Sequence, residues 1–377
     1  MPPRSIPVYE GLEEEDRARL VRDVTAAFAR AAAAAPRSSG SEEGEGDDSA
    51  EDVALPLHEV PELSKLLGID PAVYRQINAA LRGGKRHLML YGPPGTGKTE
   101  LAQHIAGVLS GGGWRMVTGS ADWSSQDIIG GYQPLGDGKV GFVPGILLQN
   151  FHRPLVIDEL NRCDVDKVLG PLFTVLSGQP TTLPYRTDAA DPASPAHVIL
   201  PRPKPGAAGH EHAPGHGWRL IATINTVDKA SLYQMSFALA RRFGWIFVDA
   251  PRDTRAFLAE FLVREGLAAT EPGSDAPLPL AAIWDAVNVV RAVGAAPIID
   301  AVRTVRSIAE DMNFAATPAA VEHRQAYLDA FSLYLLPMLD GISRQEATGI
   351  AGAVAGALAL PPDERAELER RVLTVAA

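Results

Sequence analysis

The chain has a single cysteine, Cys163, and few aromatic residues, 6% in all. One cysteine excludes an intrachain disulfide and a cysteine-based metal cluster, which fits a reducing cytosolic setting. No apolar run approaches the length of a membrane span, and the longest small-residue stretch, 350–360, ends in Pro361-Pro362. The acidic residues 13–16 lack the basic and apolar parts of a signal peptide. We therefore expect a soluble, cytoplasmic protein with no membrane partner.

Positive charge is also scarce in this chain. Lys and Arg number 35 against 46 Asp and Glu, which gives a net charge of −11. Because neutralising phosphates requires clustered Lys and Arg, this balance argues against a broad, non-specific nucleic-acid surface. A local basic pore in an oligomer stays compatible with it. The 377 residues, of which 46% are hydrophobic, suffice for one large α/β domain and a smaller second domain.

The most informative motif is a phosphate-binding loop at residues 92–99, with the sequence GPPGTGKT. An apolar run, 87–91, precedes it as a predicted strand, and a helical pattern, 99–109, follows it. Glycines allow a tight turn whose N–H groups face phosphate oxygens, and the helix N-terminus adds partial positive charge. Lys98 is placed to reach the β- and γ-phosphates, and the Thr99 hydroxyl to coordinate Mg²⁺. The alternative is a Gly/Pro-rich turn with a chance lysine, but the flanking strand and helix favour a nucleoside triphosphate site.

Composition changes divide the chain into three parts. Residues 1–54 combine a helical pattern over 10–35 with an acidic, Gly/Ser-rich stretch, 38–52, which we expect to be a flexible linker. Residues 55–250 alternate strand and helix signals, which predicts an α/β fold with a parallel sheet and helices on both faces. Residues 251–377 show helical periodicity alone, which predicts a smaller all-α lid domain. The helices expected there cover 253–266, 280–293, 298–312, 321–337 and 343–359.

One segment, 188–217, interrupts the predicted α/β core. It is rich in Pro, Gly, Ala and His, and we expect it to loop out to solvent. His210, His212 and His216 have a spacing that could hold a metal on a flexible loop. The other interpretation is a solvated polar loop whose histidines reflect composition, and it is favoured because no cysteine or second cluster supports a metal.

The second half of a hydrolytic site is predicted at residues 155–159, LVIDE. An apolar run of this kind suits a buried strand of a parallel sheet, and ligands bind at the carboxyl edge of such sheets. Asp158 would hold Mg²⁺ at the strand end, while Glu159 lies just outside the metal shell, placed to accept a proton from the attacking water or to orient it. The alternative, an acid pair at the start of the helical pattern that follows, is weakened by the P-loop upstream.

Two further polar signals follow along the chain. A strand predicted at 219–224 ends in Asn225, whose amide could bond both the γ-phosphate and the lytic water, although an Asn at a strand end is more often a turn residue. Arg241 and Arg242 end a predicted helix just before another strand, 245–248. An arginine supplied to a neighbouring subunit can stabilise charge on the transferring phosphoryl group, and the alternative role is capping of the helix C-terminus.

Taken in this order, the motifs resemble the AAA+ ATPase superfamily over roughly residues 60–310. The segments SQDIIGGY (125–132) and GKVGFVPG (138–145) are similar to those of the branch that contains MoxR-type and dynein-related ATPases, where the second forms an inserted hairpin. The segments IDELNR (157–162), INT (224–226) and ALARRF (238–243) look like the nucleotide-hydrolysing subunit of modified-cytosine restriction systems, the McrB type.

This resemblance implies an ATP-driven homo-oligomeric ring, usually hexameric, with Mg²⁺ and with nucleotide at each subunit junction. It implies Glu159, Asn225 and Arg241 or Arg242 as catalytic residues, and Thr99 with Asp158 as metal ligands. One departure concerns the second sensor, because Ile298 follows Ala296-Pro297 where MoxR-type proteins place an arginine after Ser-Pro. Arg303 and Arg306 both remain candidates for that role. The nucleotide-binding residues implied are Gly92, Pro93, Pro94, Gly95, Thr96, Gly97, Lys98, Thr99 and Glu100.

Three functions are compatible with these residues. The leading expectation is a chaperone-like ATPase of the MoxR kind that remodels a separately encoded protein client or effector. The alternative is the motor subunit of a nucleic-acid-directed restriction or defence complex, possibly driven by GTP, since no residue of the motifs reads the base. A nucleotide switch that binds without turnover is disfavoured, because it could dispense with Glu159 and the arginine pair.

Overall fold

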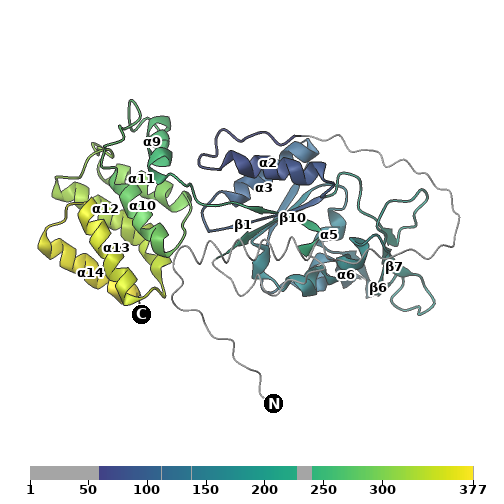
Figure 1. Ribbon diagram of the computed structural model, residues 1–377. Helices are drawn as coiled ribbons and strands as arrows, with labels where there is room; N and C mark the ends of the chain where they lie inside the picture. The colour runs from purple at the N-terminus through teal and green to yellow at the C-terminus, as the bar shows by residue number, and fades with distance from the viewer. Residues whose placement is uncertain (1–58, 112, 137, 227–239, 377) are drawn as a thin grey trace, which may run out of the picture. The chain divides into compact units, whose positions relative to one another are not determined.

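The computed structural model describes residues 59–111, 113–136, 138–226 and 240–376 (Figure 1). The predicted N-terminal helix and acidic linker, 1–54, lie outside these residues. Among the helices that are described, none combines the length and the apolar character needed to cross a bilayer.

A parallel sheet of five strands, in the order β10-β1-β9-β5-β2, forms the centre of the α/β part. The register pairs Leu88 with Ile221, Gly92 with Asn225 and Ile157 with Ala222. Strands β1 and β9 therefore end level with each other, while β5 ends beside Thr223 of β9. The strand bounds are β1 His87–Gly92, β2 Arg115–Thr118, β5 Leu155–Asp158, β9 Leu220–Asn225 and β10 Phe243–Phe247.

Helices cover both faces of this sheet, as the strand–helix alternation predicts. On one face, α2 (Pro71–Arg82) and α3 (Lys98–Ser110) pack against Leu88 and Leu90. On the other face, the apolar side chains of α6 (Val165–Val175) share a core with Met89. Neighbouring residues of β1 therefore point to opposite layers, as strand geometry requires. Shorter helical elements on the second side are α4 Ser125–Ile128, α5 Ile146–Gln149 and the 3₁₀ turn η1 Leu160–Arg162.

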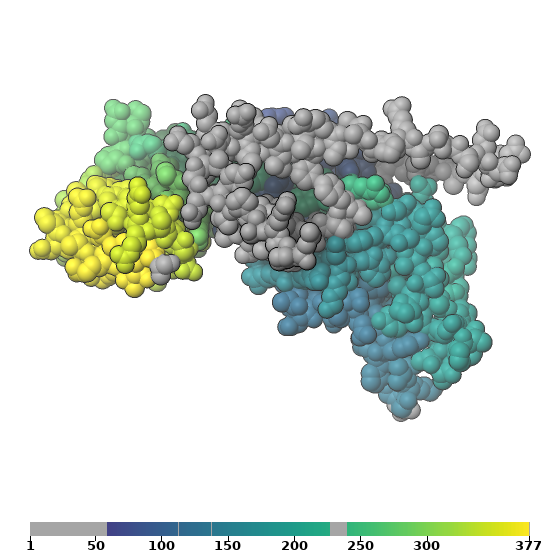
Figure 2. All heavy atoms as spheres, turned by 60° about the horizontal axis from the view of Figure 1, so that its bottom comes forward, coloured from purple at the N-terminus to yellow at the C-terminus, as the bar shows by residue number. Residues whose placement is uncertain are grey.

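Two strand insertions extend from the central sheet. The predicted hairpin is present as antiparallel β3 (Gly130–Gly136) and β4 (Lys139–Pro144). A separate three-stranded sheet consists of β6 (Thr181–Arg186), β7 (Ala196–Ile199) and β8 (Glu211–His212). Figure 2 shows the atoms of the two insertions side by side on one face of the molecule, in agreement with the hydrogen bond between the Tyr132 hydroxyl and the Arg186 N–H.

The expectation that 188–217 loops out to solvent is therefore wrong in part. Strands β7 and β8 lie within this segment, and His197 and Ile199 of β7 are buried. The four residues of β7 alternate between partly buried and buried, which is the pattern of a strand with one covered face. The alternation covers only four residues and is surrounded by Pro and Gly, so the strand was not recognised in the sequence.

A helical region follows β10, as predicted. Its core includes Trp284, Tyr327 and Phe331, all fully buried. Five of its helices coincide with the predicted ones. The sixth, α14, was not predicted, because Pro361-Pro362 was interpreted as the end of the helical pattern. Proline at the first helical position instead favours the start of a new helix. The bounds are α9 Thr254–Arg264, α10 Pro279–Val290, α11 Ala296–Ile308, α12 Val321–Tyr334, the 3₁₀ turn η2 Leu336–Leu339, α13 Arg344–Ala357 and α14 Pro362–Val375.

The turn before α11 contacts the P-loop through backbone groups. The N–H of Gly294 donates to the Pro94 carbonyl at 2.9 Å, and the N–H of Ala296 donates to the Gly95 carbonyl at 3.0 Å. A Cβ on Gly294 would lie 2.2 Å from the carbonyl carbon of Gly95, so only glycine permits this approach. The helical region is thereby fixed to the loop that is expected to hold phosphate.

Gly294→Ala is predicted to lower the free energy of unfolding by about 1–3 kcal/mol, because the added methyl group meets rigid backbone. The measurement is chemical denaturation followed by circular dichroism. Gly349→Ala is the matched control, since a Cβ at Gly349 in α13 meets no atom within 4 Å, and it should stabilise the helix by about 0.5–1 kcal/mol. Equal stability of Gly294→Ala and the wild type would contradict the close contact.

Candidate active site

The P-loop lies between β1 and α3 and lines a pocket of 510 Å³. Gly95 and Gly97 have φ angles of 74° and 80°, in the left-handed region that glycine adopts without strain. Lys98 begins α3 and is only 5% exposed, and its Nζ donates to the carbonyls of Gly92 at 3.1 Å and Pro93 at 2.5 Å. The pocket also contains Asp158, Glu159, Thr223 and Asn225. The structure thus brings the P-loop, the acid pair and the strand-end asparagine together.

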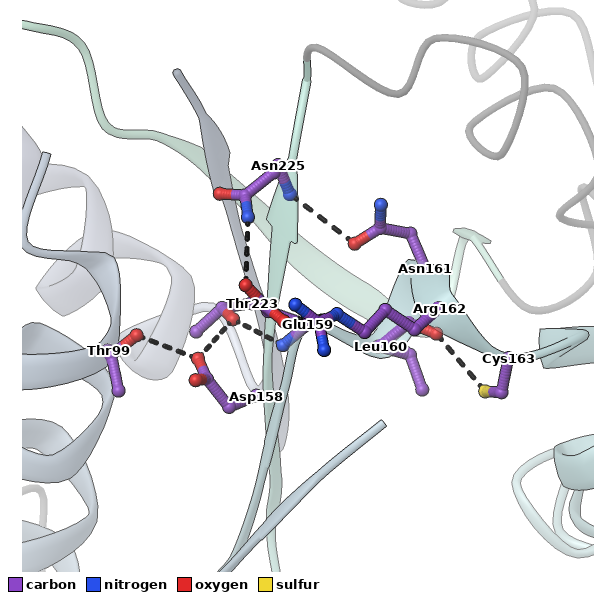
Figure 3. A network of polar contacts seen from close by, with 9 residues as sticks. All are labelled: Thr99, Asp158, Glu159, Leu160, Asn161, Arg162, Cys163, Thr223 and Asn225. Atoms are coloured by element: carbon purple, nitrogen blue, oxygen red, sulfur yellow. Dashed lines mark hydrogen bonds and ion pairs between the residues drawn. The ribbon is translucent and has the colours of Figure 1, made fainter. Parts of the chain in front are cut away.

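Asp158 accepts hydrogen bonds from two different elements (Figure 3). Its Oδ1 accepts from the Thr99 hydroxyl of α3 at 2.7 Å and from the Thr223 hydroxyl of β9 at 2.6 Å. The two residues predicted as metal ligands are therefore in direct contact. Carboxylate and hydroxyl oxygens are the ligands that Mg²⁺ prefers, so this pair fits the ion that the P-loop implies.

Glu159 points away from Asp158, toward Asn225 (Figure 3). Its Oε1 accepts from the Asn225 amide at 3.3 Å, and its other carboxylate oxygen forms an ion pair with Arg162. Its backbone N–H donates to the Thr223 hydroxyl at 2.9 Å. The φ of Glu159 is 51°, which is unusual for a residue with a side chain and turns the chain sharply after β5. The adjacent carboxylates therefore face different partners.

The surroundings of Lys98 destabilise the charged form of its amino group. Burial lowers the pKa of Lys98 to about 8, and the carboxylates of Asp158 and Glu159 oppose this shift. A phosphate in the pocket would supply the missing counter-charge. A bound anion would therefore stabilise the charged lysine beyond what Asp158 and Glu159 achieve.

The two arginines that precede β10 differ in their surroundings. Arg241 is exposed, and its carbonyl accepts from the Lys85 ammonium at 2.7 Å. Arg242 is half-buried and donates from Nη2 to the Ser177 hydroxyl at 2.6 Å. Among the described residues that line the pocket, neither arginine is present. The prediction that they end a helix is not tested, because residues 227–239 lie outside the described residues.

Both arginines considered for the second sensor belong to α11, but they differ in their position relative to the pocket. Arg303 lines the pocket, whereas Arg306 is absent from its described lining. Ile298 is fully buried in the helical core. Position 298 therefore faces away from the pocket, whereas Arg303, further along α11, lies at the pocket wall.

The histidines of the inserted sheet do not form a metal cluster. The Nε2 of His212 lies 3.0 Å from Nδ1 of His197, and the His197 ring lies 4.1 Å from that of Phe142. Within residues 59–111, 113–136, 138–226 and 240–376, no three His, Cys, Asp or Glu side chains gather in a way that could hold a metal. His197 and His212 instead pack against Phe142 and so join the inserted sheet to the β3–β4 hairpin. Burial lowers the pKa of both histidines, and the nearby His210 lowers it further.

Thr223, Asn161 and Arg162 are site residues that the sequence analysis missed. The Oδ1 of Asn161 accepts from the Asn225 N–H at 3.4 Å. Thr223 lies two residues before Asn225 on the same strand, and side chains at i and i+2 share a face of a sheet. That spacing was the signal available in the sequence.

Thr223→Val removes the hydroxyl while keeping the shape of the side chain. We predict that nucleotide hydrolysis falls at least about tenfold while nucleotide affinity changes little, because Thr223 positions both Asp158 and Glu159. The measurement is phosphate release at saturating nucleotide. Thr304→Val, which removes a hydroxyl bonded to Tyr334 in the helical region, is the control and should retain activity. Normal turnover by Thr223→Val would overturn this positioning role.

The lowered pKa of Lys98 predicts a pH dependence of nucleotide binding. Below about pH 8 the Lys98 amino group is already protonated, so the affinity for nucleotide is at its highest. Above that pH, binding must take up a proton, and affinity should fall by up to about tenfold per pH unit. Titration of a non-hydrolysable nucleotide between about pH 7 and 9.5, in buffers of different ionisation enthalpy, measures both effects. Lys98→Arg is the control, since a guanidinium stays charged throughout, and an identical profile for it would assign the effect elsewhere.

Comparisons with known proteins agree with this geometry. Residues 87–243 match the family model described as the AAA domain of the dynein-related subfamily. The chain is 29% identical over 192 residues to the type IV methyl-directed restriction enzyme EcoKMcrB subunit of Escherichia coli (strain K12), covering 46% of this chain and 37% of that protein. It is 28% identical over 192 residues to the uncharacterized protein YehL of the same strain, covering 49% of this chain and 47% of that protein. The chain thus spans less than half the length of these relatives.

Among solved structures, the RuvB Holliday junction branch migration motor of Thermotoga maritima aligns over 84% of this chain and 90% of its own, with 16% identity and a TM-score of 0.42. A point mutant of RuvB from the same organism aligns over 81% of this chain and 87% of its own, with 17% identity and a TM-score of 0.43. The parallel sheet flanked by helices, the P-loop at its carboxyl edge and the family match lead to one conclusion. Residues 87–243 have the sequence and the fold of an AAA domain of the dynein-related subfamily.

Proposed function

We propose that this protein is a ring-forming ATPase that binds and hydrolyses ATP with Mg²⁺ and uses the energy to remodel a protein client or partner complex. The observation that carries the proposal is the convergence of Lys98, Asp158, Glu159 and Asn225 in one pocket. Each of these residue types has a separate task in phosphoryl transfer to water. A site that only stored nucleotide would not need the last two.

The residues of the pocket divide the reaction among them. Thr99 and Asp158 would hold Mg²⁺, which neutralises phosphate charge when bound. Lys98, whose Nζ lies against the loop carbonyls of Gly92 and Pro93, would stabilise the negative charge of the β- and γ-phosphates. Glu159 accepts the proton of the water whose oxygen bonds to the γ-phosphorus, as the bond to the β-phosphate oxygen breaks and ADP leaves. Asn225, held against Glu159, orients that water.

Arg241 is the better candidate for the arginine that acts on a neighbouring subunit. Its side chain is exposed, whereas Arg242 is held by Ser177 within its own chain. A group that stabilises a transition state in another subunit has to be free to leave its own surface. In this arrangement Arg242 positions the segment and Arg241 reaches the phosphate.

A second candidate is a motor subunit of a nucleic-acid-directed restriction or defence complex, which could use GTP. The similarity to a restriction enzyme subunit favours it. The net charge of −11 favours a protein client instead. Stimulation of hydrolysis by DNA, or co-purification with a nuclease, distinguishes the second candidate from the first, and a comparison of kcat/KM for ATP and GTP identifies the fuel.

Glu159→Gln tests the proposal directly. The amide keeps the shape and the hydrogen bond to Asn225 but cannot accept a proton, so we predict that turnover falls by about 10²–10⁴-fold while ATP still binds. Phosphate release measures turnover, and a fluorescent nucleotide measures binding. Because it retains ATP, this variant should also hold bound partners for identification by mass spectrometry.

Glu211→Gln is the matched control for this experiment. Glu211 pairs with Lys204 on the inserted sheet, outside the described lining of the pocket, and its substitution should leave turnover intact. Wild-type hydrolysis by Glu159→Gln would remove the base from the proposed mechanism.

A further inference from the structure

The 3₁₀ turn η1, Leu160–Arg162, begins directly after Glu159 and is fixed to the core of the α/β part. Leu160 is buried, and the buried thiol of Cys163 donates to the Leu160 carbonyl at 3.1 Å. The N–H of Arg162 donates to the Glu159 carbonyl at 3.0 Å and closes the turn. Because the turn is anchored at both ends, the side chains between these anchors leave it in a defined direction.

Two consecutive side chains of η1 contact the two residues that the proposed function places at the attacking water (Figure 3). The Oδ1 of Asn161 accepts from the Asn225 N–H at 3.4 Å. The Arg162 side chain turns back to Glu159 and forms an ion pair from its Nε to Oε2. Since a 3₁₀ turn has three residues per turn, side chains three positions apart lie above one another and can meet. The turn therefore supports both Glu159 and Asn225.

The two oxygens of the Glu159 carboxylate are held with different strength. Oε2 makes the charge-assisted contact with Arg162, whereas Oε1 accepts a longer hydrogen bond of 3.3 Å from the Asn225 amide. Charge-assisted hydrogen bonds are the stronger kind and fix geometry more tightly. Asn225 lines the pocket, and Arg162 is not among the described residues of that lining. One oxygen is thus anchored from outside the pocket, and the other lies toward a pocket residue.

We propose that Arg162 is a positioning residue for hydrolysis, which anchors Oε2 of Glu159 so that Oε1 receives the proton of the attacking water. The inference rests on the proposed function and identifies the oxygen that acts in it. As the water oxygen bonds to the γ-phosphorus, its proton passes to Oε1, and the bond to the β-phosphate oxygen breaks with its electron pair leaving on ADP. Misplacing a reacting group by about 1 Å can cost about 10²-fold in rate, so an anchored carboxylate favours turnover.

A contribution to stability explains this ion pair less well than positioning does. The Arg162 side chain is 60% exposed and that of Glu159 27%, and exposed ion pairs contribute little to folding. Arg371 and Glu367 form a comparable pair within α14, with side chains 49% and 53% exposed. This second pair lies outside the described lining of the pocket and contains no expected proton acceptor. Arg371 therefore supplies the matched control.

The test is ATP hydrolysis by the full chain with Arg162→Gln, which removes the charge and keeps a polar side chain. Phosphate release over a range of ATP concentrations should give a kcat about 10–100-fold lower and a KM within about twofold of the wild type, because the base is misplaced while the nucleotide contacts remain. Arg162→Lys restores the charge without the planar guanidinium and should return kcat to within about threefold of the wild type. Arg371→Gln should leave kcat and KM unchanged. Thermal unfolding should be the same for all three variants, since exposed ion pairs add little to stability.

The double variant Glu159→Gln/Arg162→Gln separates positioning from any other role of Arg162. If Arg162 acts through Glu159, adding Arg162→Gln to Glu159→Gln should change the remaining turnover, measured with radiolabelled ATP, by less than about twofold. An equal loss in both backgrounds would place the action of Arg162 elsewhere and overturn the inference. Wild-type or faster turnover by Arg162→Gln alone would overturn it too, while the proposed function would stand. Wild-type turnover by Glu159→Gln would instead refute the proposed function and the inference with it.

Discussion

One carboxylate oxygen connects the parts of this site. Oδ1 of Asp158 accepts from the hydroxyls of Thr99 and Thr223, which belong to the P-loop helix and to the neighbouring strand. Hydrogen bonds to a charged acceptor are stronger than neutral ones, and both are partly shielded from solvent. The same Thr223 hydroxyl accepts from the Glu159 N–H, so it fixes the next carboxylate as well. The metal-binding end and the proton-accepting end of the pocket are therefore held by a single chain of contacts.

The polarity of a parallel sheet brings these contacts to one edge. Because all five strands run the same way, every strand end that carries an oxygen ligand lies at one edge, and every strand start lies at the opposite one. The acid pair occupies the first of these edges. The helical region joins this arrangement at the P-loop, where Gly294 and Ala296 donate to its carbonyls. Those carbonyls belong to the loop whose N–H groups are expected to face phosphate, so the loop links the helical region to the nucleotide.

The sequence was sufficient for features encoded by neighbouring residues. The P-loop, the acid strand and the alternation of strands and helices are local patterns, and the structure has them where they were predicted. Contacts between distant residues were out of reach: Gly294 matters only because its backbone meets Gly95. Composition misled in one place, where Pro and Gly around residues 188–217 concealed β7.

The turn after β5 explains how two adjacent carboxylates come to do different work. In a continuing strand Asp158 and Glu159 would point to opposite faces of the sheet, and Glu159 would be lost to the pocket. The left-handed φ of 51° at Glu159 ends the strand and costs about 1–3 kcal/mol of backbone strain. Its contacts with Thr223, Asn225 and Arg162 offset that cost. Gly119 at the end of β2 makes room, since a Cβ there would lie 2.4 Å from the Glu159 carbonyl oxygen. The turn that separates the metal ligand Asp158 from the proton acceptor Glu159 thus depends on Gly119, a residue with no chemical role of its own.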